Sequence, residues 1–166
     1  MIFTRTKEVA DNIFKYLDRK GMGPVKVVHS NKGQNTRINS MNEFKEGNLR
    51  ILVATDVASR GIDVINVSHV INFDVPTVYE DYVHRIGRTG RAFQSGKAIT
   101  FATKAETYHI KQIEEIIREQ IPVKELPTDI EIAETPFEEK QEMAREIDRQ
   151  RKREDPEYKG AFHERK

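Results

Sequence analysis

Cysteine is absent from this sequence of 166 residues. Without cysteine the chain can form no disulfide, has no thiolate for catalysis and builds no cysteine-containing zinc site. Long hydrophobic runs are missing as well, because no apolar stretch reaches the length of a membrane span or of a secretory signal. Both absences favour a protein of the cytoplasm that has no membrane partner, and we expect that localisation.

An excess of one charge is also lacking. The chain has 28 Lys and Arg against 27 Asp and Glu, a formal net charge of +1. The charges are unevenly placed, since residues 1–126 carry 19 basic and 15 acidic side chains, whereas residues 127–166 carry 9 and 12. This distribution permits binding to a polyanion without requiring it. The length and the 37% of hydrophobic residues suit one domain with an appendage.

A phosphate-binding loop is the third absence. Nucleotide-binding parallel sheets carry G-x-x-x-x-G-K-[ST] after the first strand, where this chain has "TRTKE". The nearest match, residues 90–97, has its glycines one residue too far apart, and Ala98 replaces the magnesium-binding hydroxyl. No Asp-Glu pair ends an apolar strand to hold magnesium and a water. By itself the chain is therefore expected not to hydrolyse a nucleotide.

What is present is a regular alternation of strand and helix patterns. Short apolar runs that predict strands occur at the N-terminus and at 25–30, 49–55, 67–73 and 97–102. Alternating strands and helices predict right-handed crossovers and a three-layer α/β fold, with a parallel sheet covered by helices on both faces. In such sheets ligands gather at the carboxyl ends of the strands. The loops at 30–37, 54–63 and 74–77 begin at or next to such ends.

The helices between these strands have recognisable starts and inner faces. Thr6 is predicted to cap a first helix with Val9, Ile13 and Leu17 on one face. The inner residues of the second helix, over 36–45, are predicted to be Ile38, Met41 and Phe44. Capping boxes at 77–80 and 103–106 predict two further helices, the first over about 78–88 and the second with Ile110, Ile113 and Ile117 on its inner side.

The pattern changes after Pro127, so residues 1–126 are predicted to form the domain and 127–166 a C-terminal extension. In the extension Thr135, Pro136 and Glu138 occupy the cap, N1 and N3 positions of a peripheral helix over about 136–154. A loose tail is expected to follow it. Because Met1 lies inside a predicted strand, we also expect that the domain was cut from something longer.

The run "HRIGRTGR", residues 84–91, concentrates cationic side chains at the end of a helix. His84 and Arg88 are one turn apart, Arg91 follows the helix, and Gly87 and Gly90 remove side chains that would block a close approach. Guanidinium groups bind phosphate oxygens through two bonds, and arginine fingers that neutralise a transferring γ-phosphoryl group raise rates by about 10³–10⁵. Alternatively the run is a basic, solvated helix end that suits the helix dipole.

Two further loops carry polar groups at strand ends. In "ATDVASRGID", residues 54–63, Thr55 and Arg60 could meet phosphates and Asp63 a ribose hydroxyl, while Gly61 ends the helical turn and Asp56 is interpreted only as a cap. In "HSNKGQNTR", residues 29–37, Gln34 and Arg37 lie a turn apart at a helix start, which favours phosphate. A capped polar loop explains that segment equally well.

Together, "IFTRTK", "GQNTR", "ATDVASRGID" and "HRIGRTGR" resemble motifs IV, IVa, V and VI of DEAD-box RNA helicases, in that order. The resemblance covers about residues 1–125, the second RecA-like domain of that family. His84 favours the DEAD-box branch, because related helicases usually carry glutamine there. The tail after residue 137 is similar to that of bacterial RhlE-like members. Ser30 departs from the pattern, since the family usually has glycine there.

The resemblance implies a role for each matching residue. Arg88 and Arg91 would be catalytic and contact the γ-phosphate of ATP, with Gly61 and Asp63 beside the ribose and Mg²⁺ held by the missing N-terminal domain. His84 and Arg85 would couple the two domains and neighbouring motifs. Contacts to the RNA backbone would come from Gln34, Arg37, Thr55, Arg60, Thr6 and Asn31.

The function implied is that of the C-terminal half of an ATP-dependent RNA helicase that opens short duplexes locally and acts as a monomer. Contacts through phosphates and hydroxyls ignore base identity, which fits an enzyme without sequence preference. A DNA helicase of the same superfamily is one alternative. A non-catalytic RNA-binding or regulatory module is another, although paired arginine fingers have no use without a phosphate across a cleft.

Overall fold

The computed structural model describes residues 1–59, 64, 67–90, 96–130, 134–155 and 157–160. Four of the predicted site residues lie outside these ranges, namely Arg60, Gly61, Asp63 and Arg91. Internal contacts divide the chain into two compact units, Met1–Phe101 and Ala102–Lys166. The division falls before the boundary expected at residue 126, so the helix that follows residue 106 groups with the C-terminal segment.

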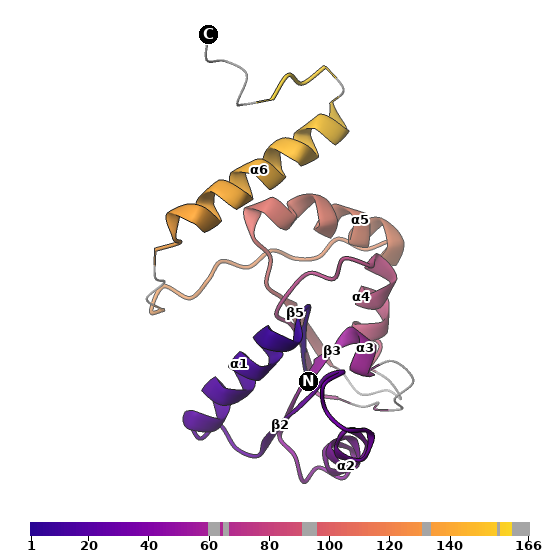
Figure 1. Ribbon diagram of the computed structural model, residues 1–166. Coiled ribbons are helices and arrows are strands. Elements are labelled where there is room, and N and C mark those ends of the chain that lie inside the picture. The colour runs from indigo at the N-terminus through magenta and orange to yellow at the C-terminus, as the bar shows by residue number, and fades with distance from the viewer. Residues whose placement is uncertain (60–63, 65–66, 91–95, 131–133, 156, 161–166) are drawn as a thin grey trace. The chain divides into compact units, whose positions relative to one another are not determined.

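The first unit contains a five-stranded sheet in which every paired strand is parallel, in the order β2-β3-β1-β4-β5 (Figure 1). The strands are β1 (Ile2–Thr4), β2 (Val25–Val28), β3 (Ile51–Thr55), β4 (His69–Asn72) and β5 (Lys97–Thr100). The three-layer α/β fold predicted from the alternating pattern is therefore confirmed. Each strand lies within its predicted run.

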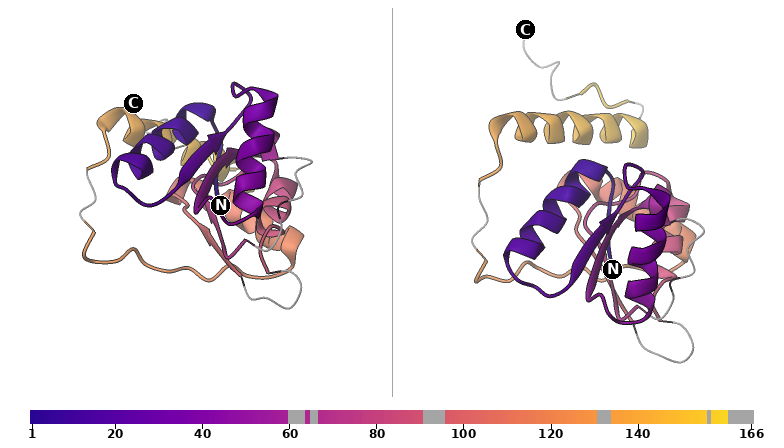
Figure 2. Two further views of the ribbon diagram at one scale, coloured as in Figure 1. Left: turned by 90° about the horizontal axis from the view of Figure 1, so that it is seen from below. Right: turned by 60° about the horizontal axis from the view of Figure 1, so that its bottom comes forward.

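Helices α1 (Lys7–Arg19) and α2 (Gln34–Lys45) lie on opposite faces of this sheet (Figure 2). Successive side chains of a strand point to opposite faces, so Val53 packs in the α1 layer while Leu52 belongs to the α2 layer. Such strands are apolar at nearly every position, because both of their faces are covered. Thr6 caps α1 as predicted, with its hydroxyl accepting a hydrogen bond from the Val9 amide at 3.2 Å.

One predicted inner residue of α2 is wrong. Met41 is buried and Phe44 packs against the same core, but Ile38 is 47% exposed. Residues three apart on an α-helix are turned by about 60° relative to one another, so Ile38 lies about 120° around the helix from Phe44. Because Ile38, Met41 and Phe44 follow one another at intervals of three residues, Ile38 lies outside the buried face of α2.

Two helix starts also differ from the prediction. Helix α4 spans Tyr79–Ile86, its cap residue is Val78, and no side chain caps it. Thr77 and Glu80 are thus one position out of register for a capping box. Pro136 takes the cap position of α6 (Phe137–Glu154) in an extended conformation, so Thr135 precedes the cap.

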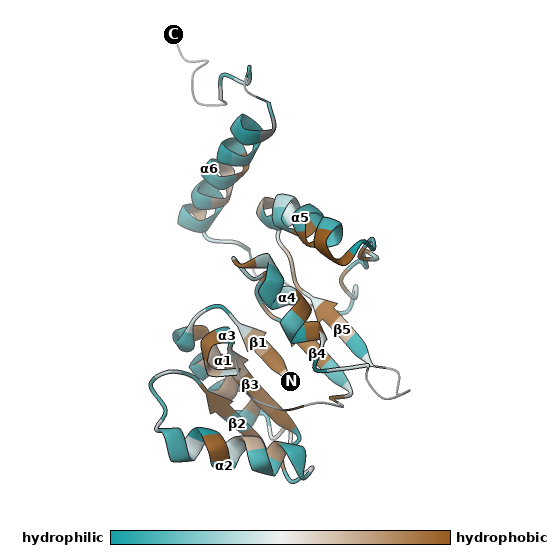
Figure 3. Cartoon of the chain, turned by 90° about the vertical axis from the view of Figure 1, so that its right-hand side faces the viewer, coloured by the Kyte–Doolittle hydropathy of each residue, from teal (hydrophilic) through white to brown (hydrophobic). Residues whose placement is uncertain are grey.

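The second unit holds the turn η1 (Lys104–Glu106), α5 (Thr107–Ile117) and α6. The predicted capping box of Thr103 and Glu106 is present, although it opens the 3₁₀ turn rather than α5 itself. The Gln150 side-chain amide of α6 donates to the Ala105 carbonyl of η1, which explains why these elements group together. Helix α6 is largely hydrophilic (Figure 3). No helix among the described residues is long and apolar enough to cross a membrane.

Candidate functional site

The carboxyl ends of the parallel strands meet at one edge of the sheet and carry most of the polar groups singled out in the sequence. The register pairs Thr4 with Thr55, and Asn72 with Thr100, at this edge. Helix α3 (Asp56–Ser59) begins directly after β3. The sheet thereby brings together residues that lie far apart in the sequence, as expected of an open parallel sheet.

Arg85, on α4, is the most buried charged residue at this edge, with 1% of its surface exposed. Its Nε and Nη2 atoms donate to the two carboxylate oxygens of Asp56, at 2.6 and 2.7 Å. Its Nη1 atom donates to the Asp74 carbonyl at 2.7 Å and to Asn72 Oδ1 at 3.4 Å. All three nitrogens of Arg85 therefore bind groups within the same unit.

The interpretation of Asp56 as only a helix cap is wrong. Its carboxylate forms the bidentate partner of Arg85, and the pair joins the end of β3 to α4 across 29 residues of sequence. The Arg85 guanidinium also lies over the Phe3 ring, 5.4 Å from the ring centre, which adds a cation–π contact from β1. Sequence spacing gives no sign of such a pairing, since both residues already have a simpler local explanation.

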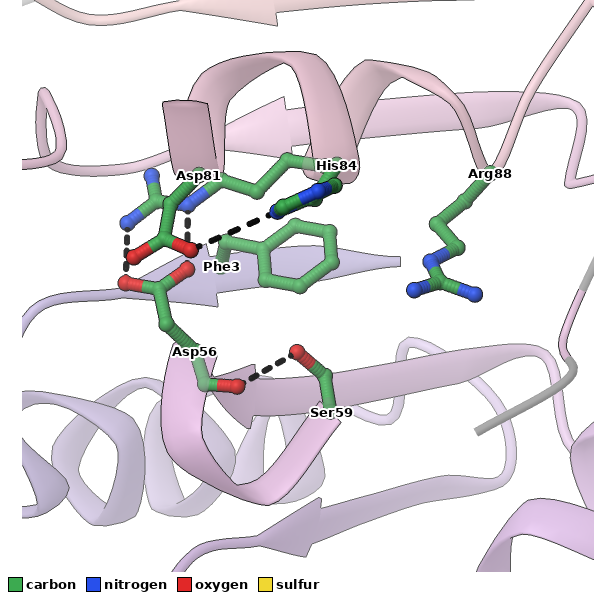
Figure 4. A pocket seen from close by; sticks show the side chains of 7 residues that line it. Phe3, Asp56, Ser59, Asp81, His84 and Arg88 are labelled. Carbon is green, nitrogen blue, oxygen red and sulfur yellow. Dashed lines mark hydrogen bonds and ion pairs between the residues drawn. The ribbon is translucent and has the colours of Figure 1, made fainter. Parts of the chain in front are cut away.

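A cavity of about 250 Å³ opens beside this ion pair. In Figure 4 the Asp56 carboxylate lies on one side of the Phe3 ring, and the Arg88 side chain lies on the other. The Nδ1 atom of the exposed His84 side chain is 3.6 Å from the buried carboxylate of Asp81. The walls of the cavity thus carry both charges, and its lining consists of Phe3, Asp56, Ser59, Asp81, His84, Arg85 and Arg88.

The end of α4 is fastened to the start of β4. The Val67 amide donates to the Arg88 carbonyl at 3.0 Å, and the Thr89 hydroxyl donates to the Val67 carbonyl. Gly90 follows with φ of +68°, a conformation that glycine adopts without strain. A side chain on Gly96 would collide with Thr89 and would approach the Gly90 amide nitrogen to 2.6 Å. The backbone that carries Arg88 is therefore held closely.

Of the predicted RNA-binding residues, Gln34 and Arg37 lie together at the start of α2. Arg37 donates from Nη1 to Gln34 Oε1 at 3.3 Å and from Nη2 to the Ala58 carbonyl of α3 at 3.1 Å. The Nε atom of Arg37 is buried and has no hydrogen-bond partner among the described residues.

The other predicted RNA-binding residues that the structure describes are Thr6, Asn31 and Thr55. Thr55 is buried at the end of β3, whereas Thr6 and Asn31 are exposed. All three follow or end a strand at the same sheet edge as Arg37. Arg60, the sixth residue of the predicted set, lies outside the described residues.

A second ion-pair cluster, missed by the sequence analysis, supports the loop that carries Asn31. His29 is buried, and its Nδ1 atom accepts from the Asn31 amide at 3.3 Å. Its Nε2 atom lies 3.1 Å from an Asp11 carboxylate oxygen, which is also 3.2 Å from the Lys32 ammonium. Burial alone raises the pKa of the Asp11 carboxyl, but bonds and charge from His29 and Lys32 outweigh it and hold that pKa below its usual value.

No group of three or more His, Asp and Glu side chains able to hold a metal ion occurs in the described part of the chain. The described residues of this edge offer cationic and hydrogen-bonding groups beside the carboxylates of Asp56 and Asp81. Arg88 can neutralise an anion, Arg37 and the strand ends can bind phosphate oxygens, and the Asp56–Arg85 pair holds the two parts in place.

Comparison with known proteins gives this arrangement a family. Residues 1–93 match the model of the helicase conserved C-terminal domain. The chain is 50% identical over 119 residues to the ATP-dependent RNA helicase dbp2 of the fungus Sclerotinia sclerotiorum, covering 72% of this chain and 21% of that protein. It is 49% identical over 133 residues to the ATP-dependent RNA helicase DbpA of Bacillus subtilis, covering 80% and 28%.

The chain thus spans only 21% to 28% of the length of these relatives. Among solved structures, it is similar to domain 2 of the DEAD-box helicase Mss116p bound to an RNA duplex. The TM-score is 0.68 and the identity 30%, over 88% of this chain and 56% of that one. Other DEAD-box proteins share the fold. The chain therefore belongs to the helicase conserved C-terminal domain family, and within it to the RecA-like C-terminal domains of DEAD-box proteins.

Proposed function

We propose that the chain is the C-terminal half of an ATP-dependent RNA helicase that separates short RNA duplexes. The observation that carries the proposal is the placement of a cationic helix end and a set of phosphate-binding donors at one sheet edge, without a phosphate-binding loop of the chain's own. A site that has cationic groups but no phosphate-binding loop needs another domain to bind the nucleotide. The relatives named above are themselves ATP-dependent RNA helicases.

On the nucleotide side, Arg88 and Arg91 act as arginine fingers on the γ-phosphate of ATP, and Gly61 and Asp63 lie against the ribose. The N-terminal domain holds the phosphates and Mg²⁺. The position of Arg88 beside the cavity, at a closely held helix end, supports this role because a finger must be fixed before the transition state forms. The proposed role of His84, whose side chain is exposed on α4, is to couple this domain to the N-terminal domain.

On the RNA side, the backbone of one strand lies along the carboxyl edge of the sheet. The strongest support is the position of the Arg37 guanidinium beside Gln34 at the start of α2, because a cation there can offer charge-assisted hydrogen bonds to an RNA phosphate. Domain 2 of Mss116p, which has the same fold, was solved with an RNA duplex. The contacts proposed are those of Gln34, Arg37, Thr55, Arg60, Thr6 and Asn31.

We further propose that the protein is a cytoplasmic monomer of a bacterium, related to RhlE. The tail after residue 137 supports the bacterial assignment. The fungal and bacterial relatives are about equally similar over the domain itself, so the assignment depends on the tail.

The full-length protein that contains this chain tests the proposal. Its ATPase activity should rise on adding single-stranded RNA, and it should unwind an RNA duplex in preference to the matching DNA duplex. Arg88→Ala should lower the RNA-stimulated kcat by about 10³-fold or more. The matched control is Arg19→Ala, because Arg19 ends α1 in a cation–π contact with Tyr16.

Equal losses for Arg88→Ala and Arg19→Ala would refute the finger assignment. ATPase activity that responds to DNA and not to RNA would replace the proposal with a DNA helicase. RNA binding by the full-length protein without any ATPase activity would leave only a binding module.

A further inference from the structure

The turn that follows β2 is held by one buried residue, His29. Its carbonyl oxygen accepts a hydrogen bond from the Lys32 amide at 3.0 Å, and its Nδ1 atom accepts one from the Asn31 amide at 3.3 Å. Only 2% of His29 is exposed, whereas Asn31 is exposed to solvent. Because its backbone amide is occupied by this bond, Asn31 can offer an RNA strand its side-chain amide, and the bond to His29 fixes the direction of that side chain.

The His29 ring is held in turn by helix α1. Its Nε2 atom lies 3.1 Å from a carboxylate oxygen of Asp11 on α1, and the same oxygen lies 3.2 Å from the Lys32 ammonium. This cluster connects α1, which starts after β1, with the turn after β2, although β3 lies between the two strands in the sheet. Thr6 caps α1. The cluster therefore fixes Asn31 relative to Thr6, another proposed RNA contact.

Stability is a weak reason for a polar ring at this place. An apolar ring of similar size would fill the same volume, and burial of polar atoms costs free energy unless they find partners. The side chains of Asp11 and Lys32 are each about a third exposed, so water screens their attraction and little stability comes from it. What an apolar ring does not supply is an acceptor for the Asn31 amide. Its loss would free the turn at little cost in stability, because water can satisfy the amide of an exposed residue.

We propose that His29 is a positioning residue for RNA binding, which orients Asn31 toward the RNA backbone by accepting the hydrogen bond of its amide. The inference rests on the proposed helicase function and adds to it a residue that acts on the affinity for RNA without touching the RNA. The described lining of the cavity beside Arg88 contains no residue of this turn. His29 should therefore affect RNA binding and leave the chemical step unchanged.

The experiment uses the full-length protein and two substitutions that separate the roles of the two ring nitrogens. His29→Asn places an amide oxygen where Nδ1 lies, so it keeps an acceptor for the Asn31 amide but does not reach Asp11. His29→Gln places its amide nitrogen near the position of Nε2 and leaves the position of Nδ1 without an acceptor. His69→Gln is the matched control, because His69 is an exposed histidine at the start of β4, whereas the turn follows the end of β2.

Fluorescence anisotropy measures the Kd for a labelled single-stranded RNA, at one salt concentration and with a non-hydrolysable ATP analogue bound. His29→Gln should raise this Kd about fivefold, the factor that one ordinary hydrogen bond contributes, and His29→Asn should stay within about twofold of the wild type. The apparent KM for RNA should rise by the same factor as the Kd, while kcat at saturating RNA should stay within about twofold. His69→Gln should keep the wild-type values.

A double variant tests whether His29 acts through Asn31. Asn31→Ala alone should weaken RNA binding, and the addition of His29→Gln should weaken it no further, since both changes remove the same contact. If His29→Gln does not fold, His29→Phe gives the same comparison, because it keeps a ring and has no acceptor.

Several results would overturn the inference. One is a wild-type RNA affinity in His29→Gln. Another is an equal loss in His29→Asn and His29→Gln, because the acceptor would then not be the cause. Losses that multiply in the double variant would show that His29 does not act through Asn31, and a kcat that falls together with thermal stability would show a merely structural role. Failure of the proposed function is distinguishable, since the wild-type protein would then show no RNA-stimulated ATPase activity.

Discussion

Arg85 lies on α4, Arg88 lies two residues past the end of that helix, and the surroundings of the two side chains differ. Arg85 is buried and satisfied by Asp56 and by two groups around β4. Arg88 is half-buried at the edge of a cavity. Two arginines of one sequence motif therefore have different environments. Arg85 binds Asp56 and so fixes α4, whereas Arg88 lies at the edge of the cavity.

The ion pair of Asp11 gives a prediction of its own at this scale. The pKa of Asp11 lies below its usual value in the folded chain, as a result of its contacts with His29 and Lys32. A carboxyl whose pKa falls on folding stabilises the folded state above its unfolded pKa, and that stabilisation is lost as the pH falls through the folded pKa. Asp11→Asn should therefore destabilise the chain at pH 7.

The effect should be at most about 1 kcal/mol, because the Asp11 side chain is partly exposed and its attraction to Lys32 is screened. Urea unfolding of the wild type and of Asp11→Asn between pH 7 and pH 2 measures the difference. The two curves should converge at acid pH. A difference that stays constant down to pH 2 would show that the charge of Asp11 is not its cause.

At the scale of elements, sequence pattern predicts what depends on near neighbours. The strands were predictable because a sheet covered on both faces requires short apolar runs, and the cap of α1 because Thr6 bonds to an amide three residues away. The exposure of Ile38 and the first residue of α4 were not predictable. Ile38 lies about 120° around α2 from Phe44 although its apolar spacing looks helical, and the cap of α4 differs from the predicted one by a single residue.

The candidate site follows the same division. The motif positions of Arg88, Arg37 and Gln34 were predictable, and the fold brings the last two together. The bonds of Arg85 to Asp56, and of His29 to Asp11, join elements that are distant in sequence. One sequence holds no information on which of its many carboxylates meets a given cation, so these partners required the structure.

The close approach of Gly96 to the end of α4 makes a prediction about that element. Gly96→Ala should push its new methyl group against Thr89 and the Gly90 amide, and so loosen the bond from Thr89 to Val67. Overpacking of this kind costs about 1–3 kcal/mol. In the full-length protein the RNA-stimulated kcat should fall as well, because Arg88, the proposed arginine finger, loses its support.

Gly33→Ala is the matched control, since a methyl group at Gly33 meets nothing within 4 Å and the residue has φ of −57°. Thermal unfolding followed by circular dichroism compares the two variants, and an ATPase assay with saturating RNA compares their rates. Equal stability of Gly96→Ala and Gly33→Ala would contradict the packing that the structure gives to this turn.

At the scale of the whole molecule, the described residues offer an incomplete nucleotide site. A ligand loses translational and rotational freedom when it binds, and contacts on several of its sides are needed to offset that loss. Here the described lining of the cavity comes from β1, α3, α4 and Arg88, and no phosphate-binding loop occurs in the sequence. This chain alone should therefore bind ATP with a Kd of about 1 mM or weaker.

The affinity of this chain for RNA should be low for the same reason, because one sheet edge contacts the RNA backbone from one side only. Isothermal titration calorimetry of this chain with ATP, and separately with single-stranded RNA, measures both affinities. The full-length protein in the same buffer should bind each ligand more tightly, and RNA should tighten ATP binding by the same factor as ATP tightens RNA binding, since coupling between two sites is reciprocal. Micromolar ATP binding by this chain alone would mean that it contains a complete nucleotide site, and Arg88 would then be one wall of that site rather than a finger offered to another domain.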